Sequence, residues 1–208
     1  MLLPRASREL TEERIVDLLR EQPLVAAPDP AYAATNALPL ENLRHAAVLV
    51  PLIWDLGQWH LLFTRRTELV HSHKGQVSFP GGAADPVDNT PEETALREAY
   101  EEIGLQPDGV RLLGRLGRRP TVTSFLITPV VGRINWPYTF QMSRDEVSRV
   151  FTIPLDWLAD PANREERPRT FPNGYQETVI YFQPYENEIL WGATARITLD
   201  LLHALLLG

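Results

Sequence analysis

The sequence predicts an α/β protein that folds as a single domain. Its 208 residues are 44% hydrophobic, which suits one compact domain with a sizeable core. Dense β-type runs occur along the same chain as patterns of helical period. We therefore expect one domain over residues 1–208, in which residues 1–40 supply an N-terminal helix and an extended segment packed on the rest.

The first predicted helix spans about residues 11 to 21. Ile15, Leu18 and Leu19 recur on one of its faces, and Thr11 provides a polar start. The stretch from there to Pro39 is rich in alanine and proline and is expected to be irregular. Since nothing before it is large enough to fold alone, we expect this stretch to lie across the domain.

Two apolar runs of β type follow, at residues 46–54 and 59–64. The turn residues between them predict an antiparallel hairpin. Pro51 interrupts the first run, and proline has no N–H to donate to a neighbouring strand. We therefore expect Pro51 at a sheet edge or a bulge.

A glycine pair then leads into a short acidic helix. Thr90 is a suitable N-cap, with Glu93 three residues later as its capping-box partner, and Pro91 fits the first helical position. Gly104 supplies the left-handed residue that commonly ends a helix. The sequence thus marks both ends of this helix.

Three acids stand together on this helix. Glu98, Glu101 and Glu102 occupy positions i, i+3 and i+4, where like charges destabilise a helix unless something compensates them. Arg97 can pair with one carboxylate, and a cluster of hard oxygen ligands is also what Mg²⁺ or Mn²⁺ requires. Taken by itself, such a run is more often a solvated acidic helix face.

Further elements are expected downstream. They are strands at residues 110–117, 125–132 and 177–182, a short helix capped by Ser143 that carries Val147 and Val150 inward, a strand end and short helix at 151–158, a charged loop at 164–172, and a final apolar helix through Leu207.

Charge and composition exclude several classes of protein. A net charge of -7 argues against a nucleic-acid surface, which needs an excess of lysine and arginine. The absence of cysteine excludes a thiol nucleophile, disulfides and thiolate metal sites. No apolar run is long enough to span a membrane and the N-terminus lacks the apolar core of a secretory signal, so we expect a soluble, cytoplasmic protein. The sequence leaves open whether it forms a homodimer.

The acidic helix also carries a resemblance to a known family. The residues that match are Arg97, Glu98, Glu101, Glu102 and Gly104, with Ala99 and Leu105 at the two aliphatic positions. Together they fill every fixed position in the second half of the Nudix signature, so the chain resembles a Nudix hydrolase. In the first half the gap between glycine and arginine is one residue longer than in the general signature, and Asp88 stands where a glutamate is expected.

The Nudix resemblance implies a fold and a chemistry. The fold is an α/β/α sandwich with a central mixed β-sheet and a loop-helix-loop that contains the signature. The chemistry is hydrolysis of a nucleoside diphosphate linked to another group. Glu98, Glu101 and Glu102 would hold Mg²⁺ or Mn²⁺, and Arg97 would orient the carboxylates.

A second motif lies just before the signature. Its residues are Leu62, Thr64, Arg66, His73, Gly75, Gln76, Val77, Phe79, Pro80, Gly81 and Gly82. They resemble the motif that marks the coenzyme A diphosphatase branch of the Nudix hydrolases. This resemblance implies that coenzyme A or acyl-CoA is cleaved to 3′,5′-ADP and (acyl-)4′-phosphopantetheine, with Arg66, His73, Gln76, Gly81 and Gly82 as substrate-binding residues.

Two roles are left open by the sequence. Side chains alternate along a strand, so Arg65 and Arg66 cannot both face one cleft, and the family position favours Arg66 as the inward residue. The general base could be one of the helical glutamates or Glu146. Glu146 is equally the capping-box partner of Ser143.

Other functions remain compatible with the sequence. The substrate could be ADP-ribose, a reduced nicotinamide dinucleotide such as NADH, or a dinucleoside polyphosphate. Outside enzymes, the chain could be a Nudix-fold binding module that has lost catalysis, or an interaction domain with an acidic surface helix. A pure binding module has no need of Arg97 and all three glutamates, and their presence favours the enzyme.

Overall fold

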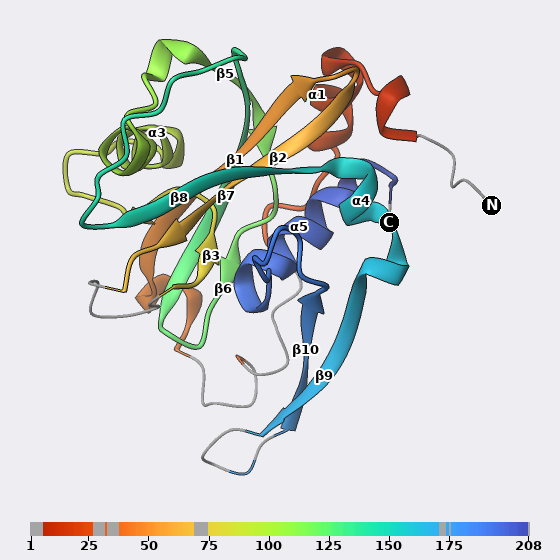
Figure 1. Ribbon diagram of the computed structural model, residues 1–208. Coiled ribbons are helices and arrows are strands. Elements are labelled where there is room, and N and C mark those ends of the chain that lie inside the picture. The colour runs from red at the N-terminus through yellow and green to blue at the C-terminus, as the bar shows by residue number, and fades with distance from the viewer. Residues whose placement is uncertain are drawn as a thin grey trace.

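The computed structural model describes residues 6–26, 32, 38–68, 75–170, 174 and 176–207 (Figure 1). Within these residues, eight strands form one mixed sheet. They are β1 (Arg44–Asp55), β2 (Gln58–Arg66), β3 (Val77–Ser78), β4 (Gly81–Ala83), β5 (Val110–Arg115), β6 (Arg119–Pro120), β7 (Phe125–Ile134) and β8 (Val147–Pro154). The main path runs β3-β2-β1-β7-β5, with β4 beside β1, β6 beside β7 and β8 beside β2. Only β1 and β7 of these pairs run parallel.

Helices cover both faces of this sheet. They are α1 (Glu12–Arg20), α3 (Pro91–Ile103), α4 (Leu155–Ala159) and α5 (Gly192–Ala204), with 3-10 turns at Ala6–Glu9, Leu40–Asn42, Pro107–Gly109 and Pro161–Asn163. In β1, Leu49 packs in one buried cluster with Ala99 of α3, and its neighbour Val50 packs in another with Leu201 of α5. Because neighbouring residues of a strand point to opposite faces, the two clusters lie on opposite sides of the sheet. The predicted α/β/α sandwich is confirmed (Figure 1).

The N-terminal helix and the hairpin form as predicted. α1 starts after Thr11, whose side chain accepts a hydrogen bond from the Arg14 N–H at 3.2 Å. Its apolar face is buried in the core, as the spacing of the apolar residues indicates. β1 and β2 pair with Asp55 opposite Gln58. Most of the alanine- and proline-rich stretch that follows α1 lies outside the described residues.

Pro51 lies inside the sheet, whereas the sequence predicts a sheet edge or a bulge there. β7 flanks β1 on one side, with Pro51 opposite Gly132. On the other side β4 pairs with β1 only as far as Val48, and β2 begins to pair at Leu52. Position 51 therefore falls between two ladders, where a missing N–H interrupts neither of them.

The ends of α3 are those that the sequence predicts. The Thr90 side chain accepts from the Glu93 N–H at 3.2 Å, and Pro91 is the first helical residue. The Glu93 carboxylate reaches back to the N–H of Asn89, at 2.6 Å, one residue before the N-cap. Gly104 ends the helix with φ of 67°. Local capping chemistry thus fixes the length of the helix that carries the acids.

The helix predicted to begin at Ser143 is wrong. The Ser143 carbonyl accepts from the N–H groups of Glu146 and Val147, at 3.0 and 2.8 Å, which closes a single turn. β8 then starts at Val147 and pairs with β2. The strand forms because this pairing satisfies backbone groups along an otherwise open edge of β2. Val147 is buried and Val150 is half-buried against the α3 side of the core.

The charged loop predicted at residues 164–172 is also wrong, because β9 (Arg164–Thr170) forms there. It pairs with β10 (Gln176–Phe182), the strand predicted at 177–182, as a two-stranded ribbon that projects from the body (Figure 1). All side chains of β9 after Arg164 are exposed. Without a buried face the strand has no apolar alternation, and the sequence gives no signal for it.

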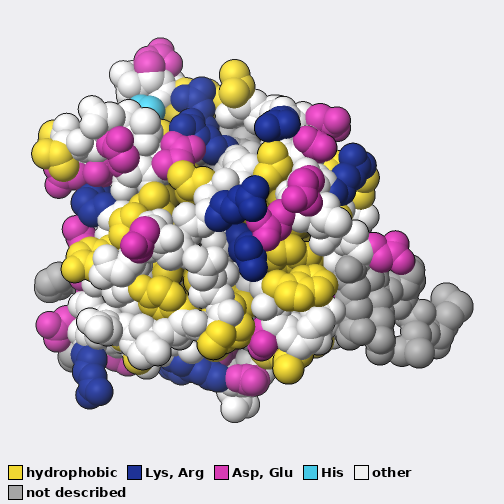
Figure 2. Space-filling view, turned by 90° about the horizontal axis from the view of Figure 1, so that it is seen from above, with side chains coloured by type: hydrophobic (Ala, Val, Ile, Leu, Met, Phe, Trp, Pro, Cys, Tyr) yellow, Lys and Arg dark blue, Asp and Glu magenta, His cyan; other side chains and the backbone are white. Residues whose placement is uncertain are grey.

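Charged and apolar groups share the surface. Figure 2 shows hydrophobic, basic and acidic side chains of the described residues interspersed on the face seen from above. Ion pairs also fix elements to one another: Glu12 of α1 lies 2.9 Å from an Arg111 nitrogen of β5 and 2.8 Å from an Arg133 nitrogen of β7. Among the described helices, none has the length and apolar content needed to cross a bilayer.

Replacing Gly104 with alanine is expected to destabilise the protein more than replacing Gly57. Both glycines have positive φ, 67° and 75°, so both variants carry the roughly 1–2 kcal/mol cost of a left-handed residue. An added Cβ at Gly104 would also lie 2.8 Å from the Gln141 Cβ, whereas at Gly57 it meets nothing within 4 Å. Urea unfolding of Gly104→Ala and Gly57→Ala measures the difference. Equal losses would show that packing at the end of α3 contributes nothing.

Candidate active site

The glycine pair of β4 brings the sheet backbone against the acidic helix. The Gly81 N–H donates to Glu102 Oε2 at 3.3 Å. A Cβ on Gly82 would lie 2.5 Å from the Glu98 carboxylate. The Glu98 carboxylate therefore lies where a side chain at position 82 would be. β4 is itself held by pairing with β1. The two glycines therefore let one stretch of backbone approach Glu98 and Glu102 closely.

Arg97 connects three acids. Its Nη1 donates to Glu98 at 2.9 Å and to Glu101 at 3.2 Å. Its Nε and Nη2 donate to Asp88 at 3.2 and 2.9 Å, and Nη2 also donates to the Ala83 carbonyl at 3.0 Å. The hydrogen bond to Asp88 is the main reason that the pKa of Arg97 is raised. One guanidinium thus sets the orientation of two helical glutamates.

Asp88 is the anchor of Arg97. Its side chain is only 5% exposed and also accepts from the Asp85 N–H and the Thr94 hydroxyl, both at 2.9 Å. The hydrogen bond from Arg97 is the largest cause that lowers the pKa of Asp88 to about 2. The loop aspartate that replaces the expected glutamate therefore acts on the arginine of the signature, a role that the sequence left undefined.

Glu102 is the most deeply buried of the three helical acids. It is 2% exposed, and Arg66 Nη1 lies 3.3 Å from its Oε1. Burial raises the pKa of Glu102 to about 8 despite Arg66, and the charges of Glu146 and Glu98 add to the rise. Burial likewise raises the pKa of Glu98. The site therefore holds more carboxyl groups than its arginines can keep ionised.

Glu146 lies in the turn before β8 and faces the same site. The Ser143 N–H donates to the main-chain oxygen of Glu102 at 2.9 Å, which attaches this turn to α3. The charge of Glu146 contributes to the raised pKa of both Glu98 and Glu102. Because residues 144–146 form a turn and no helix follows, Glu146 is not the capping-box partner that the sequence offered as an alternative.

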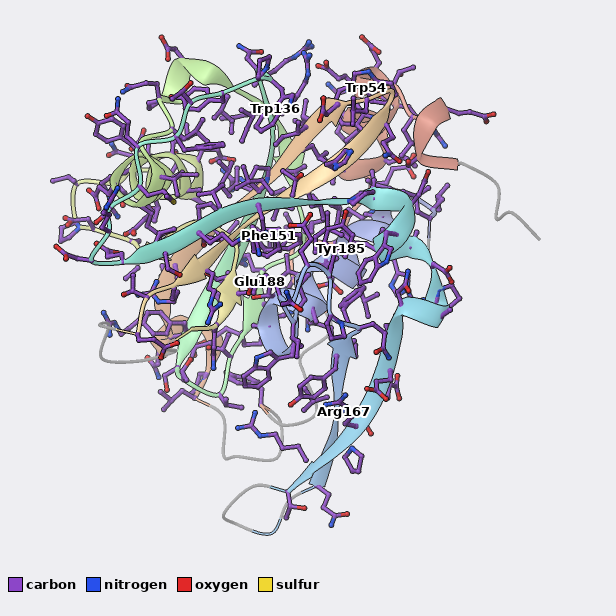
Figure 3. All side chains as sticks on the ribbon, viewed as in Figure 1. Trp54, Trp136, Phe151, Arg167, Tyr185 and Glu188 are labelled. Atoms are coloured by element: carbon purple, nitrogen blue, oxygen red, sulfur yellow. The ribbon has the colours of Figure 1, made fainter. Side chains whose placement is uncertain are left out.

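Arg65 and Arg66 face opposite sides of the sheet. Arg66 approaches Glu102 on the side of α3, whereas Arg65 Nη1 lies 3.6 Å from Glu188 on the side of α5. Arg149, opposite Arg65 in the β2–β8 ladder, donates to the same Glu188 carboxylate at 3.1 Å. Figure 3 shows Glu188 near Phe151, away from α3. Sequence reasoning missed this cluster because its members come from three distant segments.

The end of β2 also borders open space. An open hollow of about 350 Å³ lies there, and no residue of α3 or β4 belongs to its lining, which consists of Arg65, Arg66, Thr67, Glu68, Ser148 and Arg149. Of the other predicted substrate-binding residues, Gln76 accepts the Arg66 N–H on its carbonyl at 3.0 Å, which holds the start of β3 beside β2. His73 lies outside the described residues. The structure thus brings Arg66, Gly81 and Gly82 to the acidic helix and places Gln76 next to them.

The side chains present fit a divalent cation. Carboxylate oxygens are the ligands that Mg²⁺ and Mn²⁺ prefer, and the buried, under-neutralised carboxylates of this site call for added positive charge. Across the described ranges, no three His, Cys, Asp or Glu side chains already converge as a ligand set. Arg97 draws Glu98 and Glu101 to itself, and Arg66 draws Glu102. Glu98, Glu101 and Glu102 are the residues that would hold the ion.

Comparison with known proteins identifies the family of this chain. Residues 43–173 match the NUDIX domain family. The chain is 42% identical over 159 residues to a Pectobacterium atrosepticum protein described as an uncharacterized Nudix hydrolase NudL, a match that covers 76% of this chain and 81% of that protein. A Klebsiella pneumoniae protein of the same description is 41% identical over 162 residues, 77% of this chain and 82% of that protein. The crystal structure of a MutT/nudix family protein from Enterococcus faecalis has a similar fold, with a TM-score of 0.50 at 14% identity over 95% of this chain and 75% of that one.

The chain therefore belongs to the Nudix family. As a Nudix hydrolase it is an enzyme that acts on pyrophosphate bonds, and its substrates are small nucleotide-like molecules. Nudix hydrolases generally use divalent metals such as Mg²⁺ or Mn²⁺.

Replacing Asp88 with asparagine is expected to destabilise the protein at neutral pH but not in strong acid. The Asp88 carboxylate has a pKa of about 2 in the folded chain against an ordinary value of 3.8. Its stabilising contribution is therefore complete above 3.8 and is lost as the pH falls through about 2. Urea unfolding over this pH range measures the difference in the free energy of unfolding between wild type and Asp88→Asn. A difference that does not become smaller in acid would contradict a role for the Asp88 charge.

Replacing Glu102 with glutamine is expected to stabilise the metal-free protein at neutral pH. The pKa of Glu102 is about 8 in the folded chain against an ordinary value of 4.5. Glu102 therefore lowers the free energy of unfolding more and more as the pH rises from 4.5 to 8. The melting temperature of Glu102→Gln in EDTA should rise by roughly 2–4 °C for each kcal/mol recovered. Glu101→Gln, at an exposed position, is the matched control and should change little. A lower melting temperature for Glu102→Gln would count against the buried charge.

Proposed function

We propose that the enzyme hydrolyses the pyrophosphate bond of coenzyme A or acyl-CoA and releases 3′,5′-ADP and (acyl-)4′-phosphopantetheine. One observation carries the proposal: Arg66 and Gly81, both from the motif that resembles the coenzyme A branch, contact Glu102 of the signature helix. Residues of the recognition motif and of the catalytic helix therefore meet at Glu102. This supports binding of the diphosphate beside Glu102. The proposal includes the cytoplasmic location expected from the sequence.

In this proposal Glu98, Glu101 and Glu102 hold Mg²⁺ or Mn²⁺. A divalent ion bound there supplies charge neutralisation of the diphosphate and lowers the pKa of an attacking water. Arg97, anchored on Asp88, keeps Glu98 and Glu101 oriented. Without such orientation, the carboxylates would repel one another along the helix.

The residues around the helix bind the substrate. Gly81 and Gly82 carry no side chain that would block a phosphate from the backbone. Arg66 is paired with Glu102 in the structure. If Glu102 binds the metal ion instead, the planar guanidinium of Arg66 can donate to phosphate oxygens. Gln76 and His73 complete the substrate-binding set that the motif resemblance implies.

Glu146 is proposed as the general base. It belongs to the turn before β8, which the Ser143 N–H attaches to the main chain of Glu102, and its charge acts on both Glu98 and Glu102. A carboxylate whose oxygens are not engaged as ligands is free to accept the proton of the attacking water. The Glu146 backbone is held in place by the end of β2, through the Thr67 N–H at 2.9 Å.

A substrate panel tests the proposed function. Purified protein is incubated with coenzyme A, acetyl-CoA, ADP-ribose, NADH or a dinucleoside polyphosphate in the presence of Mg²⁺ or Mn²⁺, and products are identified by mass spectrometry. We expect coenzyme A to be cleaved fastest and to give 3′,5′-ADP and 4′-phosphopantetheine. Faster cleavage of another compound would overturn the substrate assignment. A metal-dependent thermal shift without cleavage of any compound would indicate a binding module.

Two variants of the same helix complete this test. Glu102→Gln should lose roughly 10²-fold or more in rate, because a lost metal ligand removes several kcal/mol of transition-state stabilisation. Glu93→Gln is the matched control in the first turn of α3, where glutamine also serves in a capping box. It should keep wild-type activity. Full activity of Glu102→Gln would contradict the metal assignment.

A further inference from the structure

The turn of residues 143–146 is held from two sides. On one side, the Ser143 N–H donates to the main-chain oxygen of Glu102 at 2.9 Å. On the other side, the Thr67 N–H donates to the Glu146 carbonyl at 2.9 Å, and the Thr67 hydroxyl donates to the Asp145 carbonyl at 2.8 Å. The turn is therefore clamped between α3 and the residue that follows β2.

Thr67 is well placed for this contact. It is only 7% exposed, so water competes little for its hydrogen bonds. Both bonds reach main-chain oxygens, and they fix the backbone that carries Glu146 while leaving the carboxylate of Glu146 to the site. Thr67 also directly follows Arg66, whose guanidinium meets Glu102. One short stretch of chain thus connects the phosphate-binding side of the site with the side that carries the base.

We infer that Thr67 is a positioning residue that sets the distance between the Glu146 carboxylate and the glutamates of α3. The inference rests on the catalytic role given to Glu146 in the proposed function, and it names the residue that makes this role geometrically possible. The influence of the Glu146 charge on the pKa of Glu98 and Glu102 agrees with close approach of the turn. A reacting group displaced by about 1 Å can lose about 10²-fold in rate, so a fixed backbone at this turn matters.

Thr67→Val is the first variant to test. It removes the hydroxyl and keeps the side-chain shape and the backbone N–H. We expect kcat to fall by about tenfold to a hundredfold with KM nearly unchanged, and Thr67→Ser to restore most of the loss, since serine regains the donor. An equal loss in Thr67→Ser would overturn the inference.

Thr198→Val is the matched control. Thr198 is fully buried in α5, on the other face of the sheet, and its hydroxyl donates to the Thr194 carbonyl at 2.9 Å. This variant also removes a buried bond from a hydroxyl to a main-chain carbonyl, here within one helix, and should leave kcat unchanged. If Thr198→Val lowers kcat as much as Thr67→Val does, the effect is general destabilisation and the inference fails.

A double-mutant cycle shows whether Thr67 acts through Glu146. In the Glu146→Gln background, Thr67→Val should cause no further loss, because the group that it positions has been removed. Losses that multiply would overturn the inference, and so would wild-type activity of Glu146→Gln. The cycle is measured with whichever pyrophosphate substrate the wild type cleaves fastest. A wrong substrate assignment therefore leaves this test intact.

Hydrogen exchange supplies a readout that needs no activity. The N–H groups of Glu146 and Val147 both donate to the Ser143 carbonyl within the turn. In Thr67→Val these two amides should exchange about tenfold faster, while amides in the middle of α3 keep their wild-type rates. Unchanged exchange at Glu146 and Val147 would show that Thr67 does not hold the turn, whatever the substrate.

Discussion

Negative charge gathered on one side of α3 is the constraint from which the active site follows. Glu102 is buried and Glu98 half-buried, and both have raised pKa values because little solvent reaches them. A helix that presents such groups to a sheet is unfavourable unless cations and N–H donors meet them. Arg97, Arg66 and the Gly81 N–H answer that demand in part. In the proposed mechanism a divalent ion would compensate the remaining carboxylates, so the imbalance that limits stability would also serve the chemistry.

The sheet separates two groups of charged residues. The pairing of β2 with β8 shifts register between Arg65 and Arg66, so that Arg65 stands opposite Arg149 and Arg66 opposite Val147. Arg65 and Arg149 converge on buried Glu188, on the face covered by α5. Of these three arginines, Arg66 is the one that pairs with α3, through Glu102. Of the two adjacent arginines at the end of β2, Arg65 thus serves packing on the α5 face, and Arg66 reaches the candidate active site on the α3 face.

Local signals let the sequence predict the helix that carries the candidate site. Thr90, Pro91 and Gly104 mark the limits of α3 because capping depends only on residues within one turn. The acids of that helix follow from their spacing. The helix predicted at Ser143 shows the limit of the same reasoning. The local sequence there suits a helix N-cap, but the segment instead pairs with a strand about 80 residues earlier.

Contacts between distant segments could not be predicted in this way. The Thr67 hydroxyl meets a carbonyl 78 residues along the chain, and no local pattern marks either partner. The role of Asp88 required knowledge of the loop that brings it under Arg97, nine residues later. β9 escaped prediction because its side chains are exposed on both faces. In each case the deciding partner is supplied by the tertiary fold.

The projecting β9–β10 ribbon poses a problem of its own in solution. Its inner strand is fastened to the body, where Tyr181 stacks on Trp191 with ring centroids 5.7 Å apart, and Arg167 covers the Tyr181 ring. Its outer strand offers a long backbone edge on which another chain could grow. Pro168 has no N–H and therefore interrupts the row of backbone N–H donors along β9. Arginine and glutamate side chains stand on either side of Pro168 in the strand. The ribbon is thereby protected against strand-by-strand polymerisation, and a protruding arm can persist in crowded solution without seeding fibrils.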